Sequence, residues 1–147
     1  MMEGIIMVLG TMMGLSVTNN KFILLLGVWA AGLSDSFANA AGILVSQETE
    51  RHHSRKEVRK STILCFFSTL AMVILLSIPL VFFKFSTAVV ISETIGLVLL
   101  GFLGYVVGKI RKVDATRQII KYVAMGVVVS AITFGLGELI KYISMLG

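Results

Sequence analysis

Charged residues are scarce in this 147-residue chain: Asp, Glu, Lys and Arg make up only 14% of it, against about 25% in ordinary globular proteins. Hydrophobic residues make up 56%, and a soluble domain of this length could not bury so much apolar surface. The shortage of charge therefore excludes an ordinary soluble fold. We predict a single all-α integral membrane domain that covers residues 1–147.

The sequence has only one cysteine and none of the familiar catalytic motifs. The one cysteine, Cys65, lies in an apolar run, which excludes an intrachain disulfide framework and a thiolate metal cluster. The sequence contains no G-x-S-x-G nucleophile motif, no phosphate-binding glycine loop and no histidine-rich metal motif. We therefore expect a protein that is not an enzyme and that uses no cofactor.

Long hydrophobic runs dominate what is present. Five apolar segments cover residues 4–18, 22–46, 61–83, 86–108 and 119–146. The last four reach the roughly 20 residues that an α-helix needs to cross a hydrocarbon core of about 30 Å. The first is short, either because it is a half-inserted helix or because its opening turns lie upstream of this chain. We predict a bundle of five transmembrane helices.

Ten of the 13 Lys and Arg residues fall in two clusters, within residues 51–60 and 109–121. Basic residues concentrate in the cytoplasmic loops of membrane proteins. We therefore predict that the N-terminus and the loops 47–60 and 109–118 are cytoplasmic and that the C-terminus lies outside. The net charge of +5 then reflects the two cytoplasmic loops of a protein embedded in the lipid bilayer, and we expect no nucleic-acid binding.

Asp35 places a carboxylate inside the second apolar segment. A charge at the middle of a membrane helix costs about 2.5–3.5 kcal/mol on insertion scales, so such a residue indicates a function. Asp35, Asn39, Gly42 and Ser46 are spaced i, i+4, i+7 and i+11 and share one helix face. Oxygen ligands along one face suit a divalent cation. The alternative is a polar contact between helices.

The first apolar segment carries a second candidate face. Glu3, Met7, Gly10, Thr11 and Gly14 share it by the same spacing. A carboxylate and a thioether lining one groove suit Fe(II) or Mn(II) better than Mg(II), because sulfur is a soft donor. The alternative is that the methionines are flexible hydrophobic residues of a lipid-embedded helix.

Three further carboxylates lie close to the ends of the segments. Glu48 and Glu50 follow the second segment and are candidates for the cytoplasmic mouth of a cation path, although a solvated helix end is the alternative. Glu93 lies close to the start of the fourth segment, and we expect it to be near the outer surface and in contact with water.

Small residues four positions apart recur in the apolar segments. The pairs are Gly10 and Gly14, Gly27 and Ala31, Ala38 and Gly42, and Gly104 and Gly108. Such pairs let two helix backbones approach closely. Packing within one bundle is the first interpretation, and dimerisation is the alternative.

Several of these stretches resemble the vacuolar iron transporter family. Glu3-Gly4 and the glycine- and methionine-rich run after it look like the Asp-Gly step of the family's first helix. The stretch GLSDSFANAAGILVSQETE at residues 32–50 is similar to its second helix, in particular that of prokaryotic relatives. The layout of the family's C-terminal half is matched by residues 101–108, a basic loop, and residues 122–126 and 135–140.

The resemblance implies a five-helix homodimer in a prokaryotic plasma membrane that exports Fe(II) or Mn(II) from the cytosol in exchange for protons. Glu3 would stand for the translocation carboxylate of the first helix. The second helix departs from the family pattern, because Asn39 stands where a methionine is expected and Ile43 where a glutamate is expected. Asp35, one turn earlier, is the candidate replacement. The family's metal-binding insert between the second and third helices is absent.

We therefore predict a divalent-metal transporter whose path is lined by Glu3, Met7, Asp35 and Asn39. The alternative is a non-transporting membrane scaffold or assembly protein that uses its polar helix face to bind another helix. A transporter places Asp35 and Glu3 toward a shared aqueous cavity, whereas a scaffold buries Asp35 against a hydrogen-bonding neighbour.

Overall fold

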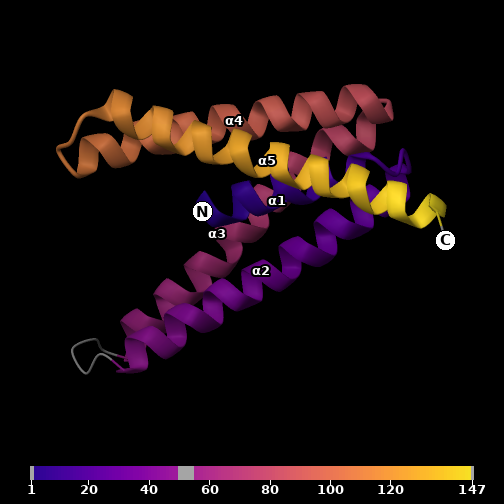
Figure 1. Cartoon of the computed structure of the whole chain (residues 1–147). Coiled ribbons are helices and arrows are strands. Elements are labelled where there is room, and N and C mark those ends of the chain that lie inside the picture. The colour runs from indigo at the N-terminus through magenta and orange to yellow at the C-terminus, as the bar shows by residue number, and fades with distance from the viewer. Residues whose placement is uncertain (1, 50–54, 147) are drawn as a thin grey trace.

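The computed structural model describes residues 2–49 and 55–146, and its elements there are all helices. They are α1 (Met2–Ser16), α2 (Lys21–Thr49), α3 (Arg55–Phe82), α4 (Phe85–Ile110) and α5 (Ala115–Leu146) (Figure 1). The all-α fold and the five predicted helices are confirmed. All five begin before the predicted apolar segments, because residues that precede those segments already continue the helices, whereas α1 ends two residues and α3 one residue earlier than predicted.

Four of these helices, α2 to α5, are long and apolar enough to cross a membrane. Many of their large apolar side chains point outward, with Phe22 and Leu64 each 72% exposed and Phe82 78% exposed, as expected for a surface that contacts lipid. The 15 residues of α1 rise only about 22 Å, which is less than the hydrocarbon core of about 30 Å. The prediction of a short first helix is confirmed.

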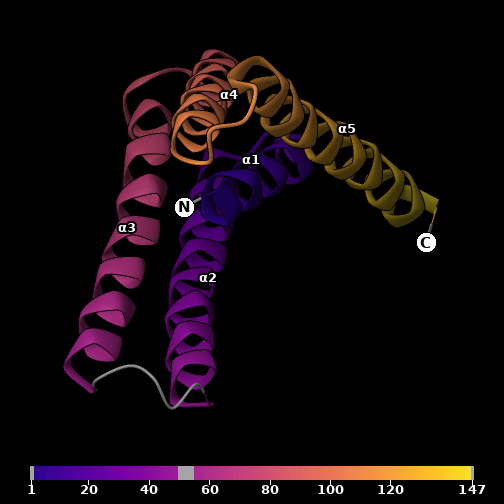
Figure 2. The same cartoon turned by 90° about the vertical axis from the view of Figure 1, so that its left-hand side faces the viewer.

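The short helix α1 lies at the centre of the molecule. It packs against each of the other four helices, which themselves pack as neighbours in chain order, α2 on α3, α3 on α4 and α4 on α5. Figure 2 shows that the α2–α3 pair and the α4–α5 pair diverge from each other, with α1 where they meet. The four long helices therefore form an open arc around α1, and the arc is open between α2 and α5.

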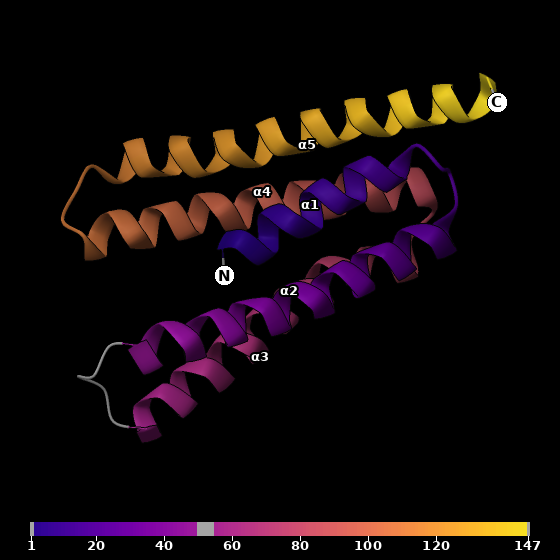
Figure 3. The same cartoon turned by 60° about the horizontal axis from the view of Figure 1, so that its bottom comes forward.

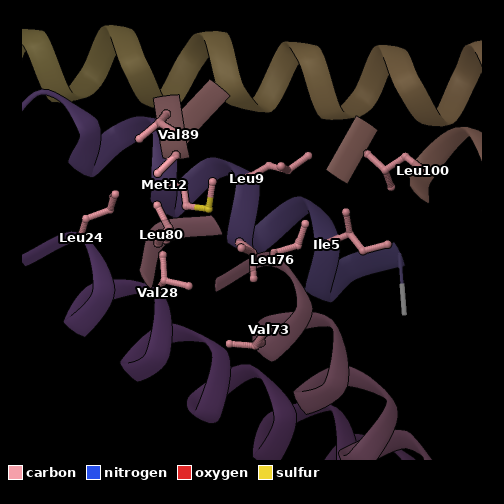
Figure 4. Close-up of a cluster of buried hydrophobic side chains, with 12 residues drawn as sticks. Ile5, Leu9, Met12, Leu24, Val28, Val73, Leu76, Leu80, Val89 and Leu100 are labelled. Atoms are coloured by element: carbon pink, nitrogen blue, oxygen red, sulfur yellow. The ribbon is translucent and has the colours of Figure 1, made fainter. Parts of the chain in front are cut away.

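One face of α1 forms the centre of the hydrophobic core. Ile5, Val8, Leu9 and Met12 are fully buried, and their spacing places them on one side of the helix. Side chains from the other helices meet this face (Figure 4): Leu24, Val28, Val73, Leu76, Leu80, Val89 and Leu100. The core thus fixes α1 against α2, α3 and α4.

Glycines bring α1 and α5 together on another side. A Cβ on Gly10 would lie 3.0 Å from Val129 Cγ1, and a Cβ on Gly137 would lie 2.4 Å from the carbonyl oxygen of Gly14. Packing within the bundle is therefore confirmed for the Gly10 and Gly14 pair. Gly42 has no atom within 4 Å of such a Cβ, so its face of α2 is open.

The antiparallel hairpins place both basic clusters at one end of the molecule. The end of α2, the start of α3 and the α4–α5 turn are all on the left of Figures 1 and 3, although the two hairpins are apart there, and the α1–α2 turn, the α3–α4 turn and the C-terminus lie at the other end. The described basic residues of both clusters are exposed: Arg59, Lys60, Lys109, Arg111, Lys112, Arg117 and Lys121. The fold therefore has a basic end, defined by these residues, and an opposite end.

Candidate cation site and the adjoining groove

Asp35 lies where the first turn of α1 meets α2 and α3. A Cβ on Gly4 would lie 3.6 Å from Asp35 Oδ2 and 2.9 Å from Cγ2 of Thr69 in α3. Because Gly4 has no side chain, α1 can close onto both residues. The antiparallel arrangement of α1 and α2 explains why Asp35 lies beside the first turn of α1. Asp35 is about four helical turns from the short α1–α2 connection, and α1 is itself about four turns long.

The carboxylate of Asp35 is half-buried and accepts a hydrogen bond from its own helix. Asn39 Nδ2 donates to Asp35 Oδ2 over 3.1 Å. The neighbouring hydroxyls donate elsewhere, Ser36 Oγ to the carbonyl oxygen of Gly32 and Thr69 Oγ1 to that of Cys65. No Lys or Arg among the described residues interacts with Asp35. The carboxylate therefore lies in an apolar bundle without a basic side chain to balance its charge.

Glu3 brings a second carboxylate to the same place. It is exposed on the first turn of α1, and it is near enough to Asp35 for the two groups to interact electrostatically. Two carboxylates from different helices repel each other unless a cation or a proton lies between them.

Met7 faces α5 and lies on the wall of a groove. The groove has a volume of about 540 Å³ at the level of Glu3, and two adjoining cavities of about 370 and 380 Å³ continue it along α1 and α5. Its walls run from the level of Glu3 to the opposite end of the molecule, as the lining residues show: Met2, Glu3, Met7, Gly10, Thr11, Met125, Thr133, Gly14, Gly137, Lys141 and Ser144. Thr11 Oγ1 donates to Met7 Sδ over 3.6 Å. We call this the α1–α5 groove.

The structure therefore divides the predicted metal path in two. Asp35 and Asn39 form one part and Met7 belongs to the α1–α5 groove, while Glu3 lies beside both. The side chain of Glu48 and the whole of Glu50 lie outside the described residues. Within residues 2–49 and 55–146 no three His, Cys, Asp or Glu side chains converge in the manner of a metal site. A cation here would complete its shell with amide, hydroxyl or thioether groups, with water, or with ligands from a second copy.

Glu93 was not among the predicted site residues. Its side chain is half-buried, and the expected contact with water is contradicted for one of its two carboxyl oxygens. Its Oε1 accepts a hydrogen bond of 2.5 Å from Ser130 Oγ of α5, and its Oε2 is buried without a hydrogen-bond partner. Position in the sequence gave its depth along α4 but not the direction of its side chain. A glutamate eight residues into an apolar helix was the only signal that could have identified it.

Comparisons with known proteins identify no relative: no family model, no curated protein and no solved structure matches the chain. The resemblance to the vacuolar iron transporter family therefore stays a prediction. Function has to be argued from the arrangement of Asp35, Asn39, Glu3 and the α1–α5 groove.

Proposed function

We propose that the protein is a membrane transporter that moves a divalent transition metal, Fe(II) or Mn(II), out of the cytosol in exchange for protons. The observation that carries the proposal is the approach of Asp35 and Glu3. They come from different helices, Asp35 half-buried in the bundle and Glu3 exposed beside it, and no Lys or Arg among the described residues interacts with Asp35, whose one positive neighbour is the N-terminal amino group. A bilayer protein that keeps two such groups together needs a positive charge between them.

The donor groups suit a borderline cation. The two carboxylates supply oxygen ligands of the kind that Mn(II) accepts, and the amide oxygen of Asn39 is available because its Nδ2 is the group bonded to Asp35. The thioether of Met7 lies in the adjoining α1–α5 groove and favours Fe(II) or Mn(II) over Mg(II).

Two surfaces lead away from the carboxylates in opposite directions. Toward the basic end runs the open face of α2, where Gly42 has no close neighbour and Ser46 is exposed. Toward the opposite end runs the α1–α5 groove. If the basic end is cytoplasmic, as the positive-inside rule predicts, a metal would enter along Ser46 and Gly42, bind at Asp35 and Glu3, and leave through the groove. Protonation of the carboxylates would release it.

We further propose that the working unit is a homodimer. The arc of helices leaves α1 uncovered between α2 and α5, as Figure 2 shows, and one copy supplies only two carboxylates to the site. A second copy across this opening would double the ligands and enclose the α1–α5 groove.

Flux through proteoliposomes tests the proposal. Wild-type protein should carry Mn(II) or Fe(II) down an imposed gradient, and D35A should abolish that flux because it removes a ligand. S34A is the matched control, since Ser34 is the exposed neighbour of Asp35 on α2, and it should transport as wild type does. Melting curves of the purified variants separate loss of transport from loss of folding. Unchanged flux in folded D35A would refute the role of Asp35.

The alternative, a non-transporting scaffold, is favoured by one observation. The hydrogen bond that Asp35 accepts comes from its own helix, as in a polar face prepared for another protein helix. Single cysteines at 35, 39 and 42 in a C65A background distinguish the two functions. A transporter should let water-soluble thiol reagents reach all three positions from the basic end, whereas a scaffold occupied by a partner helix should protect them.

A further inference from the structure

We infer that Glu93 carries a proton in this conformation and forms a proton-binding site between α4 and α5, separate from the carboxylates at Asp35 and Glu3. This rests on the proposed metal–proton exchange for its role, but not for its existence. It adds a second proton-binding site to the carboxylates of Asp35 and Glu3, whose own protonation would release the metal.

The geometry around Glu93 does not accommodate a negative charge. Only Ser130 Oγ donates to the carboxyl group, and Oε2 is buried with no partner. The surrounding helices are closely packed, since a Cβ on Gly96, one turn along α4, would lie 2.4 Å from Leu9 of α1. Glu93 lies about 12 Å from the start of α4, well inside the apolar part of the span.

Within the part of the chain that the structure describes, no positive charge acts on Glu93 to balance it if it is ionised. Among the described residues of α1, α3 and α5, no charged side chain interacts with it, and Ser130 is its one polar contact. An ionised carboxylate with a single neutral donor in such a place is far costlier than a neutral acid. A proton on Oε2 removes the charge and leaves only a neutral hydroxyl without an acceptor, which is a much smaller cost.

The position of Glu93 fits a proton site that can be reached from the α1–α5 groove. Thr133, which lines the groove, lies one turn beyond Ser130 on α5, and its Oγ1 donates to the carbonyl oxygens of Val129 and Ser130, 2.8 and 3.1 Å away. Glu93 is therefore hydrogen-bonded to a residue that lies one helical turn from the wall of the groove. A small separation of α5 from α4 at this level would let water reach the carboxyl group and take its proton.

Infrared spectroscopy of the full chain in lipid tests the protonation directly. The carbonyl stretch of a protonated carboxyl group should be present in wild type and lost in E93Q. It should move to higher frequency in S130A, because the hydrogen bond to the carbonyl oxygen is lost. E138Q is the matched control, since Glu138 is an exposed glutamate of α5, and it should leave the Glu93 band in place. An identical band in wild type and E93Q would overturn the inference.

A transport measurement tests the role. An opposing pH gradient should accelerate Mn(II) flux through wild type, and E93Q should lose that acceleration while it still binds Mn(II). Retained acceleration in E93Q would refute a coupling role for Glu93. If the wild-type protein carries no metal at all, the proposed function fails, and the infrared spectra still decide whether Glu93 is protonated.

Discussion

Gly137 provides the most direct test of how α1 and α5 form the groove. A Cβ at this position would lie 2.4 Å from the carbonyl oxygen of Gly14 and 3.1 Å from Cγ2 of Val17. Ordinary van der Waals contact begins at 3.4 Å, so one helix would have to move by about 1 Å. The oxygen belongs to the backbone of α1, and no side-chain rotation can relieve the clash.

Gly135 is a matched control on the same helix, because a Cβ there would have no atom within 4 Å. Replacing either glycine with alanine brings the same gain in helix propensity, about 1 kcal/mol at most. The difference between G137A and G135A therefore reports the clash alone, and forced overpacking of this kind costs about 1–3 kcal/mol. We expect G135A to be at least as stable as wild type and G137A to be less stable than G135A by that amount.

Unfolding of the purified variants in mixed micelles with increasing denaturing detergent, followed by circular dichroism, measures the difference. G137A should also lose transport, because separated helices change the width of the α1–α5 groove. Equal stability of G137A and G135A would refute the close approach of α1 and α5.

Two further predictions concern the ends of the helices. Lys21 Nζ donates to the carbonyl oxygens of Val81 and Phe83, 2.9 and 3.1 Å away at the end of α3. K21M should therefore lower the stability of the protein by roughly 0.3–1 kcal/mol, as measured in thermal melts. K84M removes an exposed lysine and should not lower it. Alkaline phosphatase fused after residue 146 should be active. The C-terminus lies at the end opposite the basic end, and we expect this opposite end to be outside. An inactive fusion would show that the orientation is reversed.

Segment length and hydropathy were sufficient to predict the number of helices and the short first one. They depend on a single physical quantity, the apolar length needed to cross a bilayer. The level at which α1 meets α2 also follows from the sequence, because a turn of four residues forces the two helices to run back along each other. The length of this turn accounts for the level at which Glu3 meets Asp35, although the two were predicted to share one path from their helix faces and from the resemblance.

The direction of each side chain could not be predicted in the same way. The spacing of small residues is alike in the Gly10 and Gly14 pair and in the Ala38 and Gly42 pair, yet Gly10 packs on α5 and Gly42 has no close neighbour. Which pair is used depends on where α5 lies, and the hydropathy of α5 does not reveal that. Glu93 was misjudged for the same reason, since its partner Ser130 lies on the next helix, 37 residues later.

The central position of α1 also has a consequence for biogenesis. α1 leaves the ribosome before every other helix described, yet it packs against α4 and α5, which are synthesised much later, and Leu9 lies where a Cβ on Gly96 of α4 would be. A helix of only 15 residues is too short to be held by the bilayer alone. We therefore expect α1 to reach its final packing after the other helices, although it is synthesised before them. Nascent chains arrested after α3 should leave α1 accessible to membrane proteases, and its protection should mark the moment when the α4–α5 hairpin inserts.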